Sequence, residues 1–158
     1  MSDGLRDFRK LSLDQKIAQT QASGDVRTRL LKSARELIRR SSASLSIMND
    51  WSDETSKCET AHCIGGWMTV AADIKGHDAM RVVAILAQYP EFEKMFYLTG
   101  APMSTEAFDR LEPEIRKASM LKAIDNFLKY GRPIWEEVLY GIEPPPDPSE
   151  SSEASDLD

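Results

Sequence analysis

Apolar residues in this chain recur mainly at steps of three and four, in short segments that glycine and proline interrupt. The clearest segment begins at Val26, and its apolar side chains share one face of a helix: Val26, Leu30, Leu31, Ala34, Leu37 and Ile38. Pro90, Pro113 and Gly131 mark helix boundaries further along the chain. The pattern contains no hairpin signal and predicts an all-α fold, a compact irregular bundle of six or seven short helices.

Local capping signals set the expected ends of several helices. Ser12 and Gln15 have the spacing of a capping box, and Ser104 is the expected N-cap of a short helix. Gly76 is expected to end the helix that follows the cysteines, as a left-handed cap, and Asp78 to cap the next helix.

Charge and proline content divide the chain near residue 141. From Gly141 to Asp158 there are six acids and no Lys or Arg, and these six acids equal the whole net charge of −6. Such a segment cannot bury enough apolar surface to offset the conformational entropy that ordering would cost, so 141–158 is expected to be a disordered acidic tail. We expect a flexible N-terminus over 1–11 and a single helical domain over 12–140.

The acidic tail is expected to act mainly in solubility, and the alternative is mimicry of nucleic acid or masking of a basic surface. No apolar run approaches the roughly 20 residues that cross a bilayer. The first ten residues contain acids and lack the apolar stretch of a secretory signal. We therefore expect a cytoplasmic protein that makes no membrane contact, in which cysteines are more often thiols or metal ligands than a disulfide.

Both cysteines lie in the stretch CETAHCIGGWM, residues 58–68. If a helix begins at Thr60, one of its faces carries Cys63, Gly66, Trp67, Val70, Ala71 and Ile74. Cys63 would then fill space in the core, and the glycines would let a neighbouring helix approach beside Trp67. The residues expected to form this structural motif, with Trp51 anchoring a loop to the core, are Trp51, Cys58, Thr60, Cys63, Gly66 and Trp67.

A metal site or a reactive thiol is the alternative interpretation of this stretch. Cys58, His62, Cys63 and His77 are all the Cys and His residues of the chain, and their number suits tetrahedral zinc. Neighbouring His62 and Cys63 project about 100° apart on a helix, however, and the spacing is not a common structural-zinc pattern. A disulfide would require the Cα atoms to lie within about 7 Å, and a nucleophilic Cys58 would need His62 as its base.

No phosphate loop, HExxH motif or nucleophile elbow occurs in the sequence. We therefore predict no catalytic residue, no cofactor and no metal site, and a metal-binding or thiol-dependent enzyme is kept as the alternative function.

The polar face of helix 26–40 carries a stripe of five cations: Arg29, Lys32, Arg35, Arg39 and Arg40. Five cations in a row could neutralise phosphates, so nucleic-acid binding is a further alternative. A solvated face, or contact with the acidic tail, is the simpler interpretation, because no aromatic residues stand between the cations to stack on bases. The segment 134–140, with Trp135, is too short to be stable alone and should dock on the core or on a partner.

Three stretches occur in an order that resembles an uncharacterised family of small phage and bacterial proteins. They are M-x-x-W at 48–51, a C-G-T-x-x-C-I-A-G-W-like segment at 58–67 and A-I-D-N-F at 123–127. Glu59 stands where the pattern has Gly, and Gly65 stands where it has Ala. The resemblance implies a helical fold and a mobile-element origin, but no reaction.

Taken together, these patterns predict a non-enzymatic interaction protein that binds a host or partner macromolecule. The candidate partner surfaces are the cation stripe of helix 26–40, the segment around Trp135 and the acidic tail. The sequence indicates neither the identity of the partner nor the oligomeric state.

Overall fold

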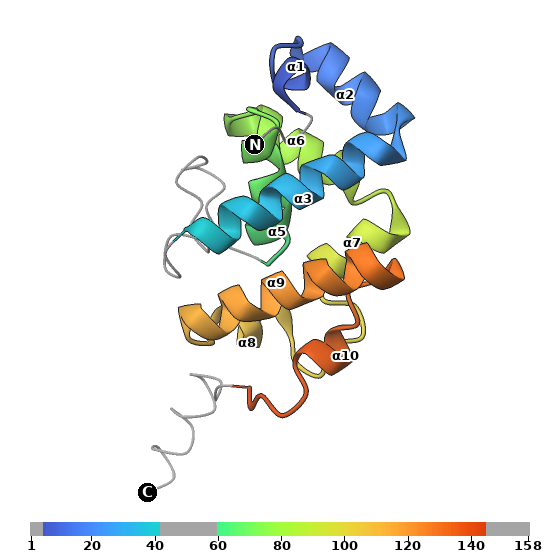
Figure 1. Ribbon diagram of the computed structural model, residues 1–158. Coiled ribbons are helices and arrows are strands. Elements are labelled where there is room, and N and C mark those ends of the chain that lie inside the picture. Colours follow the sequence, from blue (N-terminus) through green and yellow to red (C-terminus); the bar gives the residue numbers. More distant parts are fainter. Residues whose placement is uncertain (1–4, 42–59, 145–158) are drawn as a thin grey trace, which may run out of the picture.

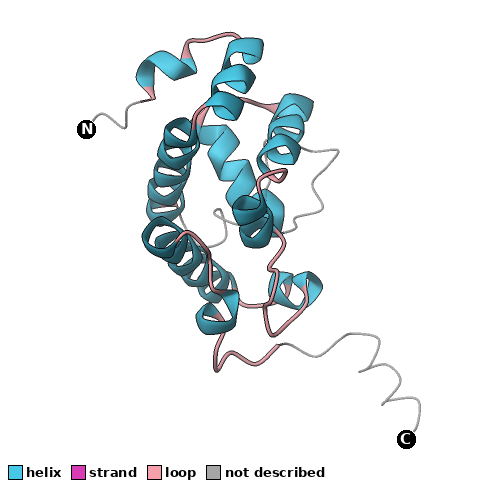
Figure 2. Ribbon diagram, turned by 90° about the vertical axis from the view of Figure 1, so that its right-hand side faces the viewer, coloured by secondary structure: helices cyan, strands magenta, loops and turns pink. Residues whose placement is uncertain are grey.

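Helices dominate the residues that the structure describes, which are 5–41 and 60–144, and no strand occurs among them (Figure 2). The predicted all-α class is therefore confirmed. The computed structural model has nine helices in these residues: α1 Arg6–Arg9, α2 Leu13–Ala22, α3 Gly24–Arg40, α5 Thr60–Ala71, α6 Gly76–Leu86, α7 Pro90–Phe96, α8 Thr105–Asp109, α9 Pro113–Tyr130 and α10 Trp135–Val138. Within the described ranges, no helix is both long and apolar enough to cross a bilayer.

Several helix ends lie where the local signals predicted them. The side chain of Ser12 accepts from the backbone N–H of Gln15 at 3.2 Å, and the Gln15 side chain accepts from the N–H of Ser12 at 3.1 Å, which completes the capping box of α2. The Ser104 side chain caps α8 by accepting from the backbone N–H of Ala107 at 3.1 Å, and Gly131 ends α9 in the left-handed conformation with φ +81°.

The predicted boundary between α5 and α6 is wrong. Asp73, with φ +57°, takes the left-handed position after α5, and its N–H donates to the carbonyl oxygen of Val70 at 3.0 Å. Gly76, with φ +63°, is the first residue of α6, and Lys75 occupies the N-cap position that was expected for Asp78. An aspartate tolerates the left-handed region better than most residues, so α5 ends at Ala71, five residues before the glycine.

Helix α5 lies at the centre of the structure. It packs against α3, α6, α7 and α8, while α3 and α9 run antiparallel side by side (Figure 1). A methyl group on Gly65 would come within 3.1 Å of a Val83 side-chain carbon on α6 and 3.3 Å of a Phe96 ring carbon on α7. The missing side chain therefore lets three helices meet closely at this point.

The buried face of α5 differs from the expected one by about one position. Ile64 and Met68 are fully buried, whereas Val70, which was placed on the core face, is 37% exposed and Trp67 is half-buried. The side chains of residues 60–63 lie outside the described part, so the inward orientation of Cys63 stays a prediction.

The N-terminal helices attach to the C-terminal end of α5. Leu5 and Phe8 are buried in the core, although residues 1–11 were expected to be flexible. The Arg9 Nε donates to the carbonyl oxygen of Ala71 at 2.7 Å, and the buried Lys16 Nζ donates to that of Asp73 at 3.0 Å. Cations at a helix C-terminus satisfy its free carbonyls and interact favourably with the helix dipole.

We predict that Gly65→Leu lowers the free energy of unfolding by about 1–3 kcal/mol, because the added side chain overpacks the contact with Val83 and Phe96. Urea unfolding measures the effect. Ala84→Leu on the exposed face of α6 is the matched control and should change stability by less than about 0.5 kcal/mol. Equal stability of the Gly65→Leu variant and the wild type would show that the helices are not in close contact there.

Candidate functional site

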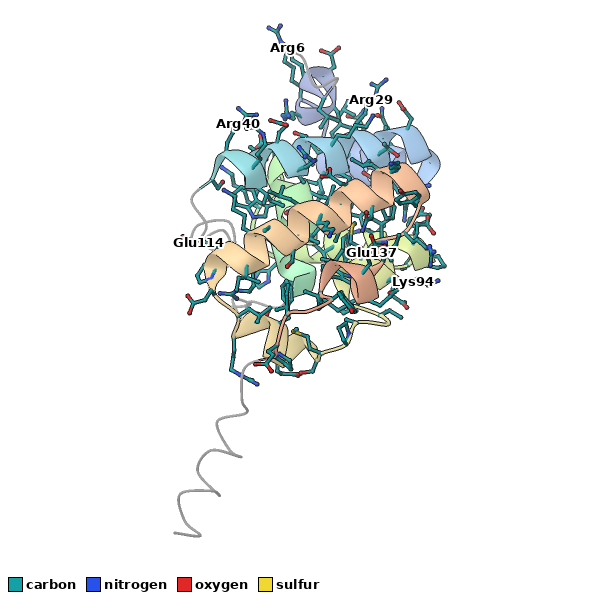
Figure 3. The ribbon with its side chains drawn as sticks, turned by 60° about the horizontal axis from the view of Figure 1, so that its bottom comes forward. Arg6, Arg29, Arg40, Lys94, Glu114 and Glu137 are labelled. Atoms are coloured by element: carbon teal, nitrogen blue, oxygen red, sulfur yellow. The ribbon has the colours of Figure 1, made fainter. Side chains whose placement is uncertain are left out.

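Most cations of the stripe on α3 form ion pairs with acidic side chains. Arg29 pairs with Asp25 at 3.0 Å, one turn away on the same helix. Arg39 contacts Glu36 at 2.8 Å, and Arg40 lies 3.9 Å from the same carboxylate. Figure 3 shows Arg29 and Arg40 toward opposite ends of α3. The stripe is thus a row of ion pairs rather than an uninterrupted positive surface.

Arg35 connects the stripe to α9. Its Nε donates to Asp125 Oδ1 at 2.5 Å, and its Nη2 donates to Asp125 Oδ2 at 3.2 Å, so the pair is bidentate. The hydrogen bond that Arg35 donates to Asp125 is the largest effect on its pKa and raises it. Burial, the next largest, lowers the pKa, and the charges of Asp125 and Glu36 raise it further. A bidentate pair between two helices fixes their relative register.

Glu36 is shared by three arginines. Its pKa is lowered, first by the hydrogen bond from Arg39 and then by the charges of Arg39, Arg40 and Arg35. A lowered carboxyl pKa means that these pairs stabilise the folded protein above the ordinary Glu pKa, and that this contribution is lost as the pH falls through the folded-state value.

Lys117 of α9 completes the contact at the other end of α3. Its Nζ donates to the carbonyl oxygen of Arg39 at 3.1 Å and to that of Ser41. Arg35 and Lys117 thus join the same two helices as cationic donors, Arg35 to a carboxylate of α9 and Lys117 to backbone carbonyl oxygens at the C-terminal end of α3. Much of the predicted basic surface therefore serves the packing of the protein itself, and nucleic-acid binding stays a prediction that these contacts do not favour.

The cysteine motif falls largely outside the described part. Trp51 and Cys58 lie beyond the described ranges, and Thr60, His62 and Cys63 are described in backbone only, at the start of α5. Gly66 is buried, and its carbonyl oxygen accepts from the Thr69 hydroxyl at 2.6 Å.

Of the four metal candidates, His77 has a described side chain, which is exposed, whereas Cys58 and the side chains of His62 and Cys63 lie outside the described part. His77 lies near the start of α6, and the eight residues from Cys63 to Ala71 account for roughly 12 Å of helix rise along α5. Among the described residues, no group of three or more Cys, His, Asp or Glu side chains is arranged to hold a metal ion. A metal or thiol site built on Cys58, His62, Cys63 and His77 stays a prediction.

Trp135 belongs to the core and not to a partner surface. Its side chain is fully buried, its Nε1 donates to the carbonyl oxygen of Lys94 at 3.0 Å, and its ring meets Phe108 edge-on at 5.8 Å between centroids. The expectation that Trp135 forms part of a partner surface is therefore wrong. Its large aromatic ring is surrounded by apolar side chains of this chain, and its one polar group has a hydrogen-bond acceptor here.

Docking of Trp135 creates a groove between the second half of α9 and α10. We call it the α9–α10 groove, and it is a concave region of about 650 Å³ that is lined by Lys122, Arg132, Ile134, Glu136, Glu137, Val138 and Tyr140. Tyr140 is 86% exposed, the highest exposure among the large apolar side chains of the described residues. Figure 3 shows Glu137 on α10, close to Lys94 of α7.

The backbone at the base of the groove is strained. Ile134 has φ +55°, a left-handed conformation that a β-branched residue adopts at a cost of about 1–2 kcal/mol. The neighbouring Pro133 carbonyl accepts from Asn126 Nδ2 at 3.0 Å, and the buried Trp135 holds the other side. Strain that the surroundings maintain is common where a surface has a function.

Sequence reasoning missed most of the groove. The segment 134–140 was identified by its helical spacing, but the contribution of Lys122 depends on how α10 packs on α9, which no local signal encodes. Comparison of the chain with family models, with curated proteins and with solved structures finds no match. The resemblance to small phage and bacterial proteins therefore stays a prediction.

We predict that Arg35 and Asp125 are energetically coupled. A double-mutant cycle with Arg35→Gln and Asp125→Asn should give a coupling of about 0.2–1 kcal/mol in urea unfolding, since the pair is partly exposed. The coupling should decrease in 1 M salt because the Debye length falls to about 3 Å. The cycle on Asp25 and Arg29, a pair within α3, is the control. A zero coupling for Arg35 and Asp125 would exclude a role in joining α3 to α9.

Proposed function

We propose that this protein is a non-enzymatic interaction protein that binds a protein partner through the α9–α10 groove. One observation carries the proposal: the groove combines a concave surface of about 650 Å³ with an 86% exposed Tyr140 and the exposed Arg132. Tyr and Arg are enriched among the residues that dominate the energetics of protein interfaces.

The charges that line the groove indicate what kind of partner fits it. Lys122 of α9 and Arg132 of the connecting loop are exposed, and Glu136 and Glu137 of α10 supply two negative charges. A surface with both signs selects a partner segment that presents an acid and a base at matching positions. Nucleic acid, which presents phosphates alone, would meet the repulsion of the two glutamates.

The rigidity of the groove also supports the proposal. Trp135 fixes α10 to the core, and the strained Ile134 is held between that anchor and the hydrogen bond from Asn126 to Pro133. A preorganised surface loses less conformational entropy on binding than a flexible one.

The composition and one sequence resemblance indicate a biological setting. A cytoplasmic location rests on the composition of the chain, and a phage or mobile-element origin rests on the resemblance at residues 48–67 and 123–127. Small proteins from such elements often act by binding a host component, which agrees with a binding surface on a stable helical scaffold.

The test uses a photo-cross-linking amino acid in place of Tyr140, and separately in place of Tyr97, which is 48% exposed and does not line the groove. We expect one dominant protein adduct in host cells from position 140 and none from position 97. Tyr140→Ala and Arg132→Ala should then lower the affinity for that purified partner at least tenfold, whereas Tyr97→Ala should leave it unchanged.

Two outcomes would contradict the proposal. The first is equal labelling from positions 140 and 97, which would indicate unspecific contact. The second is a partner whose affinity the groove variants do not change, which would place the interface on another surface of the protein.

A further inference from the structure

Arg116 occupies an unusual place for a charged side chain. It lies on the core face of α9, at helical spacing with Ser119, Met120, Ala123, Ile124 and Phe127, all of which are buried. Arg116 itself is 9% exposed. Its guanidinium carries a positive charge, although most of the side chain is out of water.

The Arg116 Nε is buried and has no hydrogen-bond partner, and no ion pair joins its guanidinium to another described residue. Other buried or partly buried cations of the chain have hydrogen-bond acceptors. The buried Lys16 donates to Asp73, Arg9 donates to Ala71, and Lys117, the next residue of α9, donates to two carbonyl oxygens of the chain. A buried donor without a partner is costly, so the Nε of Arg116 is an exception that calls for an acceptor beside it.

The position of Arg116 in its helix adds to the positive potential. It is the fourth residue of α9, and side chains on a helix lean toward its N-terminus. Pro113 has no N–H to satisfy, and the N-cap residue Glu112 makes no side-chain hydrogen bond to the helix within the described residues. The N–H groups of the first turn and the dipole of the 18-residue helix α9 therefore act in the same direction as the guanidinium.

The acids of this turn do not neutralise Arg116. Glu112 and Glu114 are exposed, and neither forms an ion pair with its guanidinium. Figure 3 shows Glu114 at the end of α9 that lies toward Arg40 of α3. The positive charge therefore remains without a described counter-charge.

We propose that Arg116 and the first turn of α9 form a binding site for a phosphate group, either free inorganic phosphate or a phosphate carried by a small ligand. The planar guanidinium can donate two parallel hydrogen bonds to phosphate oxygens, and helix N–H groups are common donors to the same ligand. A doubly charged tetrahedral anion compensates both the guanidinium and the helix dipole, which a single carboxylate would do less completely. This site is independent of the α9–α10 groove and of the proposed partner.

The test measures thermal unfolding and the ³¹P NMR signal of inorganic phosphate with the full chain. Phosphate should raise the unfolding midpoint more than chloride or acetate does at equal ionic strength, since a ligand that binds the folded state stabilises it. Arg116→Met should abolish this shift and lower the phosphate affinity at least tenfold. Arg116→Lys, which keeps the charge but loses the planar guanidinium, should lower the phosphate affinity by a smaller factor.

Arg110→Met, at an exposed arginine after α8, is the matched control. It should keep both the shift of the unfolding midpoint and the phosphate affinity of the wild type.

A small phosphorylated compound such as a sugar phosphate, titrated in the same way, distinguishes the two sources of the group. Stronger binding of that compound than of inorganic phosphate would indicate a carried phosphate, and equal or weaker binding would indicate the free ion; both agree with the site. If Arg116→Met does not fold, the wild type and Arg116→Lys still decide the question by NMR.

Three results would overturn the proposal. A wild type that responds to phosphate no more than to chloride would show that another part of the chain compensates Arg116. An equal response to acetate would assign the site to carboxylates. A phosphate response that survives in Arg116→Met would indicate an adventitious ion only.

Discussion

The close approach of three helices at Gly65 determines how the rest of the structure is arranged. With no side chain at this position, α5 can lie against Val83 of α6 and Phe96 of α7 while its opposite side packs on α3. Ile64 and Met68, on either side of this contact, are fully buried. A helix that is surrounded on several sides has little room for long side chains, which explains why α5 contains so many small residues.

Polar contacts between backbone carbonyls and long cationic side chains complete this arrangement at the helix ends. Arg9 and Lys16 bring α1 and α2 to the C-terminal end of α5, and Lys117 brings α9 to the C-terminal end of α3. Each contact satisfies carbonyl groups that a helix leaves without partners, and each places a positive charge where the helix dipole favours it. The protein therefore uses many of its cations for its own packing. Among the described residues, the proposed binding surfaces are the α9–α10 groove and the turn of α9 that contains Arg116, whose buried Nε has no hydrogen-bond partner.

Local signals predicted helices well and their contacts poorly. Ser12, Ser104 and Gly131 act within one turn of the chain, so their roles could be predicted from the sequence. The end of α5 at Ala71, with the left-handed Asp73 after it, was missed because Gly76 gave a stronger signal for the same conformation.

Contacts between distant segments could not be predicted in this way. The pairing of Arg35 with Asp125 joins residues 90 positions apart, and the burial of Trp135 depends on the placement of Lys94 and Phe108. The buried face of α5 was displaced by about one position because Trp67 and Val70 were assumed to point inward, whereas a helix with neighbours on several sides has no single apolar stripe. The candidate groove and Arg116 both arise from such tertiary contacts.

Native-state hydrogen exchange of the full chain tests most directly whether α5 is the centre on which the other helices depend. We expect the amides of residues 64–71 to exchange only through global unfolding, with an opening free energy equal to that of the whole protein. Exchange of these amides at a clearly lower opening free energy than those of α3 and α9 would contradict this description, because it would mean that α5 can detach while the helices around it remain folded.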